Sequence, residues 1–125
     1  MSLIDTHVLI WLLSDSSLLS ENARKELESG NKIYVSIASL WEIAIKKTIG
    51  KLKLSYSIKD IVSKCEKYRI DILQIKPEHL DYIETLPDIH NDPFDRLIIS
   101  QALIENMSLI TRDNTIPKYP VKVIW

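Results

Sequence analysis

The apolar residues of this chain alternate between short runs typical of strands and longer stretches with helical spacing. Runs rich in β-branched residues predict five strands, over Leu3–Asp5, Ile33–Val35, Ile70–Ile75, Leu109–Thr111 and Val121–Ile124. Helical patterns lie between them, over Val8–Leu13, Glu21–Ser29, Ser36 or Ser39 to Thr48, Ser57–Tyr68, from Pro77 onward, and Pro93–Ile104. Strands separated by helices predict an α/β fold with a mainly parallel five-stranded sheet, joined by right-handed crossovers and covered on both faces.

Capping residues indicate where several of these helices begin. Thr6 is the predicted cap of the first helix, because its hydroxyl can accept a hydrogen bond from the first turn. Asp92 is the predicted cap of the last helix, since Pro93 suits the first helical position that follows. For the third helix, Ser36 and Ser39 are both candidate caps.

The composition is that of one ordinary globular domain. With 125 residues, 46% of them hydrophobic and 26% charged, the chain is expected to form a single domain over residues 1–125. Cys65 is the only cysteine, which excludes an internal disulfide and a thiolate zinc site and is typical of a reducing compartment. The apolar run Val8–Leu13 is too short for a membrane span and has no basic residue before it, so a cytoplasmic location is expected.

Four acids are predicted to meet at one edge of the sheet. Asp5 ends the first strand and Asp113 follows the fourth, while Glu42 and Asp95 lie near the starts of two helices. In parallel sheets, ligands bind beyond the carboxyl ends of the strands, where loops and helix N-termini converge. Taken singly, each acid also has a local explanation as a helix cap or a turn residue. Their origin in four separate segments favours a shared site.

Carboxylates that share a cleft require a cation. Two of them about 4 Å apart repel by roughly 4 kcal/mol at an effective dielectric constant near 20, which is large beside a domain stability of about 5 to 15 kcal/mol. Oxygen ligands without a Cys or His cluster suit Mg²⁺ or Mn²⁺, and such ions favour phosphoryl chemistry. The chain has only two glycines, too few for a nucleotide-binding loop, so hydrolysis of a polymer's phosphodiester bonds is the expected reaction.

The formal net charge of −1 hides two regions of opposite sign. Eight basic residues face two acids between Lys46 and Arg69, and eight acids face two bases between Glu78 and Asp113. The basic region is a candidate contact for a polyanion, although solvated helix faces explain the same pattern.

The histidines and tryptophans carry weaker signals. The histidines are scattered, and ordinary hydrogen-bonded or exposed positions are expected in preference to acid–base roles for His7, His79 and His90. Core positions are expected in preference to base stacking for Trp11, Trp41 and Trp125.

Six segments follow one another in an order that is far more specific than any single acid. They cover residues 3–11 (LIDTHVLIW), 39–46 (SLWEIAIK), 50–52 (GKL), 90–96 (HNDPFDR), 101–102 (QA) and 109–113 (LITRD). Together they resemble the PIN-domain ribonucleases of the VapC type over almost the whole chain. The resemblance implies an α/β/α sandwich, RNA cleavage that depends on Mg²⁺ or Mn²⁺, homodimers, and the toxin role in a toxin–antitoxin pair, where a small antitoxin protein masks the site.

The resemblance also assigns roles to particular residues. The metal ligands and catalytic residues that it implies are Asp5, Glu42, Asp95 and Asp113. Neighbouring residues are weaker expectations: Thr6 and Thr111 to orient ligands, Arg96 and Arg112 to contact phosphate or steady the carboxylates, and Lys46, Lys47, Lys51 and Lys53 to bind the RNA backbone. Only four residues precede Asp5, so the first strand is expected to be short and this carboxylate less firmly held than the others.

Two other classes of protein were weighed against a nuclease. A phosphotransfer domain needs an acidic pair by the first strand and a phosphorylatable Asp after a middle strand, whereas Asp5 precedes Thr6 and the third strand runs into Lys76. A catalytically silent RNA-binding or regulatory module on the same fold stays open as the alternative, because sequence alone does not measure metal binding.

Overall fold

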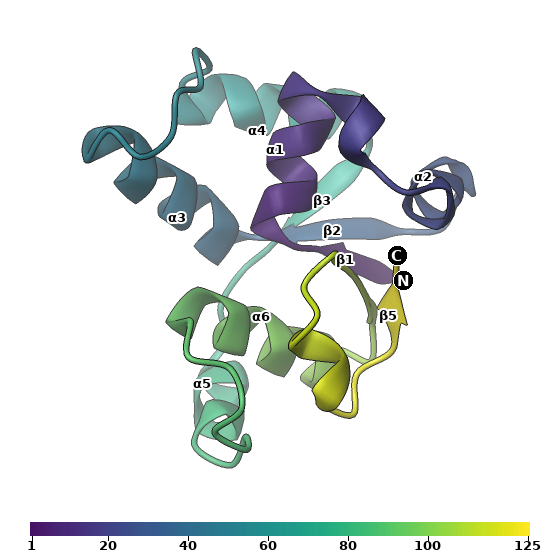
Figure 1. The fold of residues 1–125 in the computed structure, drawn as a ribbon, viewed down its shortest axis with the longest axis vertical. Coiled ribbons are helices and arrows are strands. Elements are labelled where there is room, and N and C mark those ends of the chain that lie inside the picture. Colours follow the sequence, from purple (N-terminus) through teal and green to yellow (C-terminus); the bar gives the residue numbers. More distant parts are fainter.

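The computed structural model describes residues 1–125 and contains a fully parallel five-stranded sheet in the order β3-β2-β1-β4-β5 (Figure 1). The strands are β1 (Ser2–Ile4), β2 (Ile33–Ser36), β3 (Ile70–Leu73), β4 (Ser108–Ile110) and β5 (Val123–Ile124). The first strand lies at the centre, where Ile4 pairs with Val35 of β2 and Ile110 of β4. The sequence prediction of a parallel α/β fold is therefore confirmed.

Helices cover both faces of this sheet. One face carries α1 (Thr6–Ser14), α2 (Glu21–Glu28), α3 (Ile37–Thr48) and α4 (Ile58–Lys67), and the other carries α5 (Pro77–Ile83) and α6 (Pro93–Ile104), as Figure 1 shows. Because side chains alternate along a strand, Ile4 packs among the first group of helices and Leu3 among the second, both fully buried. The result is the expected α/β/α sandwich with two separate apolar cores. No helix reaches the length and apolarity that a membrane-spanning segment needs.

Two strands are shorter than the apolar runs that predict them. The run Ile70–Ile75 forms a strand only to Leu73, and the run Val121–Ile124 forms one only from Val123. Each of these edge strands has a single neighbour, and β5 pairs with just two residues of β4. The length of the partner strand, rather than the apolar run, therefore sets where an edge strand ends.

The caps of two helices differ from the predictions in an informative way. Asp5, not Thr6, caps α1, because β1 ends at Ile4 and the Oδ1 atom of Asp5 accepts a hydrogen bond from the Val8 amide at 2.8 Å. Ser36 rather than Ser39 caps α3, accepting from the Ala38 amide at 3.0 Å.

Asp92 caps the last helix, α6, as predicted. Its Oδ1 atom accepts hydrogen bonds from the amides of Phe94, at 2.8 Å, and of Asp95, at 3.1 Å. Pro93 occupies the first helical position, where its missing N–H leaves no donor unsatisfied. The Asp92 carboxylate is therefore engaged in holding the start of the helix that carries Asp95.

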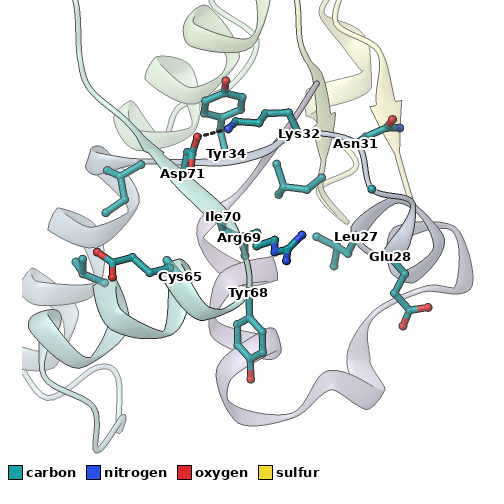
Figure 2. A pocket seen from close by; sticks show the side chains of 15 residues that line it. Leu27, Glu28, Asn31, Lys32, Tyr34, Cys65, Tyr68, Arg69, Ile70 and Asp71 are labelled. Carbon is teal, nitrogen blue, oxygen red and sulfur yellow. Dashed lines mark ion pairs between the residues drawn. The ribbon is translucent and has the colours of Figure 1, made fainter.

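The largest groove of the molecule lies away from the four predicted acids. It encloses about 970 Å³ at the end of the sheet where β2 and β3 begin, and the Lys32–Asp71 ion pair, with N and O 2.7 Å apart, lies beside it (Figure 2). The Cys65 side chain lines this groove but is itself buried, and burial raises the pKa of its thiol. Cys65 therefore behaves as the small buried hydrophobe that its sequence context predicts.

Candidate metal-binding site

The four predicted acids all lie at the edge of the sheet where the strands end. Asp5 follows β1 directly, Asp113 lies in the loop after β4, Glu42 is in the second turn of α3, and Asp95 is in the first turn of α6. The charges of Asp5 and Glu42 both act on the carboxyl of Asp95. Asp5, Glu42, Asp95 and Asp113 are called the acid cluster below.

Asp5 is the most deeply fixed member of the acid cluster. Only 4% of the residue is exposed, its Oδ1 atom accepts from the Val8 amide, and its Oδ2 atom accepts from the Thr111 hydroxyl. Burial raises the pKa of this carboxyl and outweighs both hydrogen bonds, which act in the opposite direction. The expectation that a short first strand would hold Asp5 loosely is wrong, because contacts with α1 and with Thr111 fix it instead.

Thr111 connects two acids that are distant in sequence. Its hydroxyl donates to Asp5 and accepts from the backbone amide of Asp113 at 3.0 Å. The residue is 1% exposed, so water does not compete for these bonds. The expected role of Thr111 in orienting a neighbouring acid therefore has a matching set of contacts.

Glu42 is held by one partner on each oxygen. The Thr6 hydroxyl donates to Oε1 at 2.6 Å and lies 2.9 Å from the Ser39 hydroxyl, while the Lys46 ammonium donates to Oε2 at 2.7 Å. The alternative that Glu42 forms a capping box with Ser39 is wrong, because Ser36 is the cap and the Glu42 carboxylate points to other partners.

Asp95 has the most strongly perturbed carboxyl in the protein. Burial raises its pKa to about 7, and the negative charges of Asp92, Asp5 and Glu42 act in the same direction. His90 opposes this change, since its Nε2 atom lies 3.1 Å from the Oδ2 atom of Asp95. An acid that gains a proton near neutral pH because other acids surround it marks a place where a cation would be favourable.

Asp113 is bound through both of its oxygens. Oδ1 accepts from the amides of Thr115, at 2.7 Å, and Ile116, at 3.3 Å, and Oδ2 lies 2.9 Å from the Nε2 atom of His90. Burial alone would raise the pKa of Asp113, but the hydrogen bonds from His90, Thr115 and Ile116 outweigh it and hold the pKa below its ordinary value.

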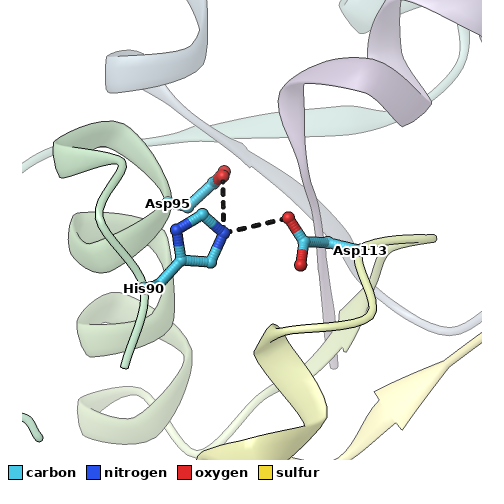
Figure 3. Close-up of side chains that lie close together, drawn as sticks. All are labelled: His90, Asp95 and Asp113. Atoms are coloured by element: carbon cyan, nitrogen blue, oxygen red, sulfur yellow. Dashed lines mark hydrogen bonds and ion pairs between the residues drawn. The ribbon is translucent and has the colours of Figure 1, made fainter. Parts of the chain in front are cut away.

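His90 is the site residue that sequence reasoning missed. Its ring lies between Asp95 and Asp113, as Figure 3 shows, and its side chain is 13% exposed. The only signal in the sequence is its place five residues before Asp95, which by itself does not distinguish it from an ordinary loop histidine.

The basic residues expected near the site have varied partners. Lys46 pairs with Glu42, the Lys47 ammonium donates to the Tyr56 carbonyl, and Lys51 and Lys53 are exposed. Arg96 donates to the carbonyl of Pro87 at 2.9 Å and to that of Ile83 at 3.3 Å. The structure thus gives Arg96 contacts that hold the loop before α6.

Arg112 and the tryptophans lie around this edge of the sheet. The guanidinium carbon of Arg112 is 6.0 Å from the ring centroid of Trp11, which also contacts His7 and Trp125. The expectation of a core position is wrong for Trp41, which is 59% exposed because it lies on the outer side of α3 and contacts the Phe94 ring edge-on.

The donor set fits a hard divalent cation. Carboxylate oxygens from four segments converge, and the only cations within bonding distance of them are Lys46 and, when protonated, His90. Mg²⁺ and Mn²⁺ prefer such oxygen ligands. The raised pKa of Asp95 is the direct sign that the site lacks positive charge in the absence of an ion.

Comparison with known families agrees with this fold and site. The family model of the PIN domain matches residues 2–122, so the chain belongs to the PIN domain family, as the sequence motifs indicate. No curated protein sequence matches the chain.

Solved structures with the same fold come from toxin–antitoxin complexes. VapBC2 from Rickettsia felis, bound to a promoter DNA fragment, has a chain that matches with a TM-score of 0.70 and 19% identity, over 98% of this chain and 96% of that one. A toxin–antitoxin complex from Klebsiella pneumoniae matches with a TM-score of 0.68 and 19% identity, over 100% and 97% of the two chains. FitAcB from Neisseria gonorrhoeae matches with a TM-score of 0.67 and 18% identity, over 98% and 96%. At such identities the likeness establishes the shared fold.

Proposed function

We propose that this chain is a divalent-metal-dependent endoribonuclease and the toxin of a toxin–antitoxin pair. The observation that carries the proposal is the acid cluster, in which carboxylates from four separate segments gather at the ligand-binding edge of a PIN fold. Mutual repulsion makes such an arrangement unfavourable for folding, so its presence favours a functional role.

The four acids would hold Mg²⁺ or Mn²⁺. The chemistry that such an ion supplies is activation of water and neutralisation of the negative charge that develops on phosphate oxygens during hydrolysis. Thr111 and Thr6 fix the carboxylates of Asp5 and Glu42 in place, so these ligands need little rearrangement to bind. Lys51 and Lys53, exposed just beyond α3, are the basic residues free to contact an RNA backbone.

A protein partner is part of the proposal. Trp41 and Phe94 are the immediate neighbours in sequence of Glu42 and Asp95, and Trp41 is largely exposed. Ile49, 58% exposed, extends this apolar surface at the end of α3. Because structures of the same fold come from toxin–antitoxin complexes, we assign this surface to a small antitoxin that covers the acid cluster. A homodimer of the nuclease chain is also proposed, as the family resemblance implies.

The test is cleavage of end-labelled RNA by the purified protein with EDTA, Mg²⁺ or Mn²⁺. The expected result is metal-dependent cleavage that leaves a 3′-hydroxyl and a 5′-phosphate, since water and not a ribose 2′-hydroxyl is the nucleophile. Asp95→Asn is expected to abolish cleavage without unfolding the protein, because the amide keeps the size of the side chain and removes its charge. Asp88→Asn, at an exposed acid of the loop before α6, is the matched control and should leave cleavage intact.

Each part of the proposal has its own contrary outcome. Metal binding without cleavage of any RNA would favour the silent RNA-binding or regulatory module. Equal cleavage by wild type and Asp95→Asn would remove the acid cluster from the reaction. A nuclease that no protein encoded beside it inhibits would not be a toxin of this kind.

A further inference from the structure

His90 is the one residue of the site that reaches two acids at once. Its Nε2 atom lies 2.9 Å from Oδ2 of Asp113 and 3.1 Å from Oδ2 of Asp95 (Figure 3). A nitrogen and two carboxylate oxygens so close together could be three ligands of one metal ion. They could equally be a donor and its two acceptors, and the other nitrogen of the ring decides between these cases.

The Nδ1 atom of His90 accepts a hydrogen bond from the backbone amide of Asp92 at 3.1 Å. This amide is available because Asp92 is the cap of α6, so its N–H lies outside the helical hydrogen-bond ladder. A ring nitrogen that accepts from an N–H carries no hydrogen itself, so the ring proton must be on Nε2. The Nε2 atom then has a hydrogen to donate to the two acids and no lone pair to offer a metal.

This arrangement is the reverse of the one found at metal-binding histidines. A ligating histidine uses one nitrogen for the metal and donates the hydrogen of the other nitrogen to an acceptor. In His90 the second nitrogen faces a donor instead of an acceptor. Ligation through Nε2 would move the ring proton to Nδ1, against the Asp92 N–H, and would break this hydrogen bond.

The surrounding structure fixes the ring in this orientation. The backbone amide of His90 donates to the Tyr119 hydroxyl at 2.8 Å, and that hydroxyl donates in turn to the Pro87 carbonyl at 2.8 Å. Tyr119 is 2% exposed, so the loop that carries His90 is anchored to the second apolar core.

We propose that His90 is a positioning residue which donates its Nε2 hydrogen to Asp113 and Asp95 and thereby aims Asp113 into the acid cluster without binding metal itself. The Oδ1 atom of Asp113 is already bound by the amides of Thr115 and Ile116, which leaves Oδ2 as the oxygen free to act. With a side chain 30% exposed, Asp113 lies more open to solvent than Glu42 or Asp95, so it depends most on such a donor. The inference rests on the proposed function for what the site binds, but the state of the ring does not.

The first measurement is the tautomer of His90 in metal-free protein, read from long-range ¹H–¹⁵N correlations of its imidazole. We expect Nε2 protonated and Nδ1 unprotonated, and we expect this pattern to persist when Mg²⁺ is added. A ring with its hydrogen on Nδ1, or one that changes to that form with Mg²⁺, would overturn the proposal. The His90→Gln spectrum, which lacks these correlations, assigns them.

The second measurement is Mn²⁺ affinity by calorimetry for wild type, His90→Ala and His90→Gln. Loss of the donor in His90→Ala should weaken Mn²⁺ binding by roughly 10- to 100-fold, as is typical for groups that orient metal ligands. The glutamine amide carries N–H donors at about the reach of Nε2, so His90→Gln should recover most of the affinity. Equal affinity in all three proteins would contradict the positioning role.

The two measurements separate failure of this inference from failure of the proposed function. Should wild type bind no Mn²⁺, the proposed function fails, whereas the tautomer still decides whether His90 is a fixed donor. Melting temperatures accompany each variant, and should His90→Ala be unfolded, His90→Gln and the wild-type tautomer carry the test. A simple structural role would lower stability without the pattern of loss in alanine and recovery in glutamine.

Discussion

The substitution Asp95→Asn should stabilise the metal-free protein while removing its response to metal. In the folded protein the pKa of the Asp95 carboxyl is about 7, against an ordinary value of 3.8 in the unfolded chain. Each pKa unit corresponds to about 1.4 kcal/mol, and the side chain is only 22% exposed, so ionising Asp95 at pH 8 costs the folded state about 4 kcal/mol. A neutral amide of the same shape avoids this cost and keeps an oxygen that can accept from His90.

The sign of the pH dependence follows from which state binds the proton. Between pH 4 and pH 7 the folded protein holds a proton on Asp95 that the unfolded chain has released, so this group makes stability fall as the pH rises. The advantage of Asp95→Asn should therefore be about 4 kcal/mol at pH 8 and less than half of that at pH 5. Urea unfolding in EDTA at the two pH values measures it, with the exposed Asp88→Asn as the matched control.

Metal should reverse the order of stability. Free Mg²⁺ or Mn²⁺ at about a hundred times its Kd stabilises a protein by about 2.7 kcal/mol, and this gain should appear in wild type but not in Asp95→Asn. If Asp95→Asn is no more stable than wild type in EDTA at pH 8, the reasoning from repulsion within the acid cluster is refuted. An equal metal response in the two proteins would refute the shared cation site.

Three further predictions concern the neighbours of the acid cluster. Thr111→Val should lower the free energy of unfolding by about 1 to 3 kcal/mol in urea, because buried Asp5 loses its donor, whereas Thr115→Val, which leaves that hydroxyl in place, should change it little. Lys51→Gln with Lys53→Gln should flatten the salt dependence of RNA binding, measured on inactive Asp95→Asn protein, by roughly 0.7 in slope for each phosphate that no longer meets a lysine, and an unchanged slope would return these lysines to solvated surface. Trp41→Ala should leave the melting temperature almost unchanged, because the ring is 59% exposed, and should weaken inhibition by the antitoxin equally at low and high Mg²⁺. An inhibition midpoint that moves in proportion to Mg²⁺ would instead indicate a partner that competes with metal for the acids.

Local signals in the sequence were sufficient wherever structure depends on neighbouring residues. The strand and helix order follows from apolar spacing, and Asp92 with Pro93 marks the start of α6 because a cap and the first helical position are one residue apart. The edge location of the four acids also follows from the sequence, since strands separated by helices pair in parallel and their carboxyl ends share one side. Thr6 shows where such signals mislead, because the strand ends one residue earlier than its apolar run suggests and Asp5 takes the cap.

The partners of each acid depended on tertiary structure alone. His90 meets Asp113 across 23 residues of sequence, and Thr111 meets Asp5 across 106, and neither distance leaves a periodic or local pattern. Which face of α3 is open also depends on packing, and this is why Trp41 is exposed although its residue type suggests a core position.

The sequence by itself therefore determined the fold class, the family and the charged groups that converge, because backbone preferences and strand order act over short distances. Only the tertiary structure decided the hydrogen-bond direction at His90 and the raised pKa of Asp95, because both depend on the burial and orientation of groups from separate segments.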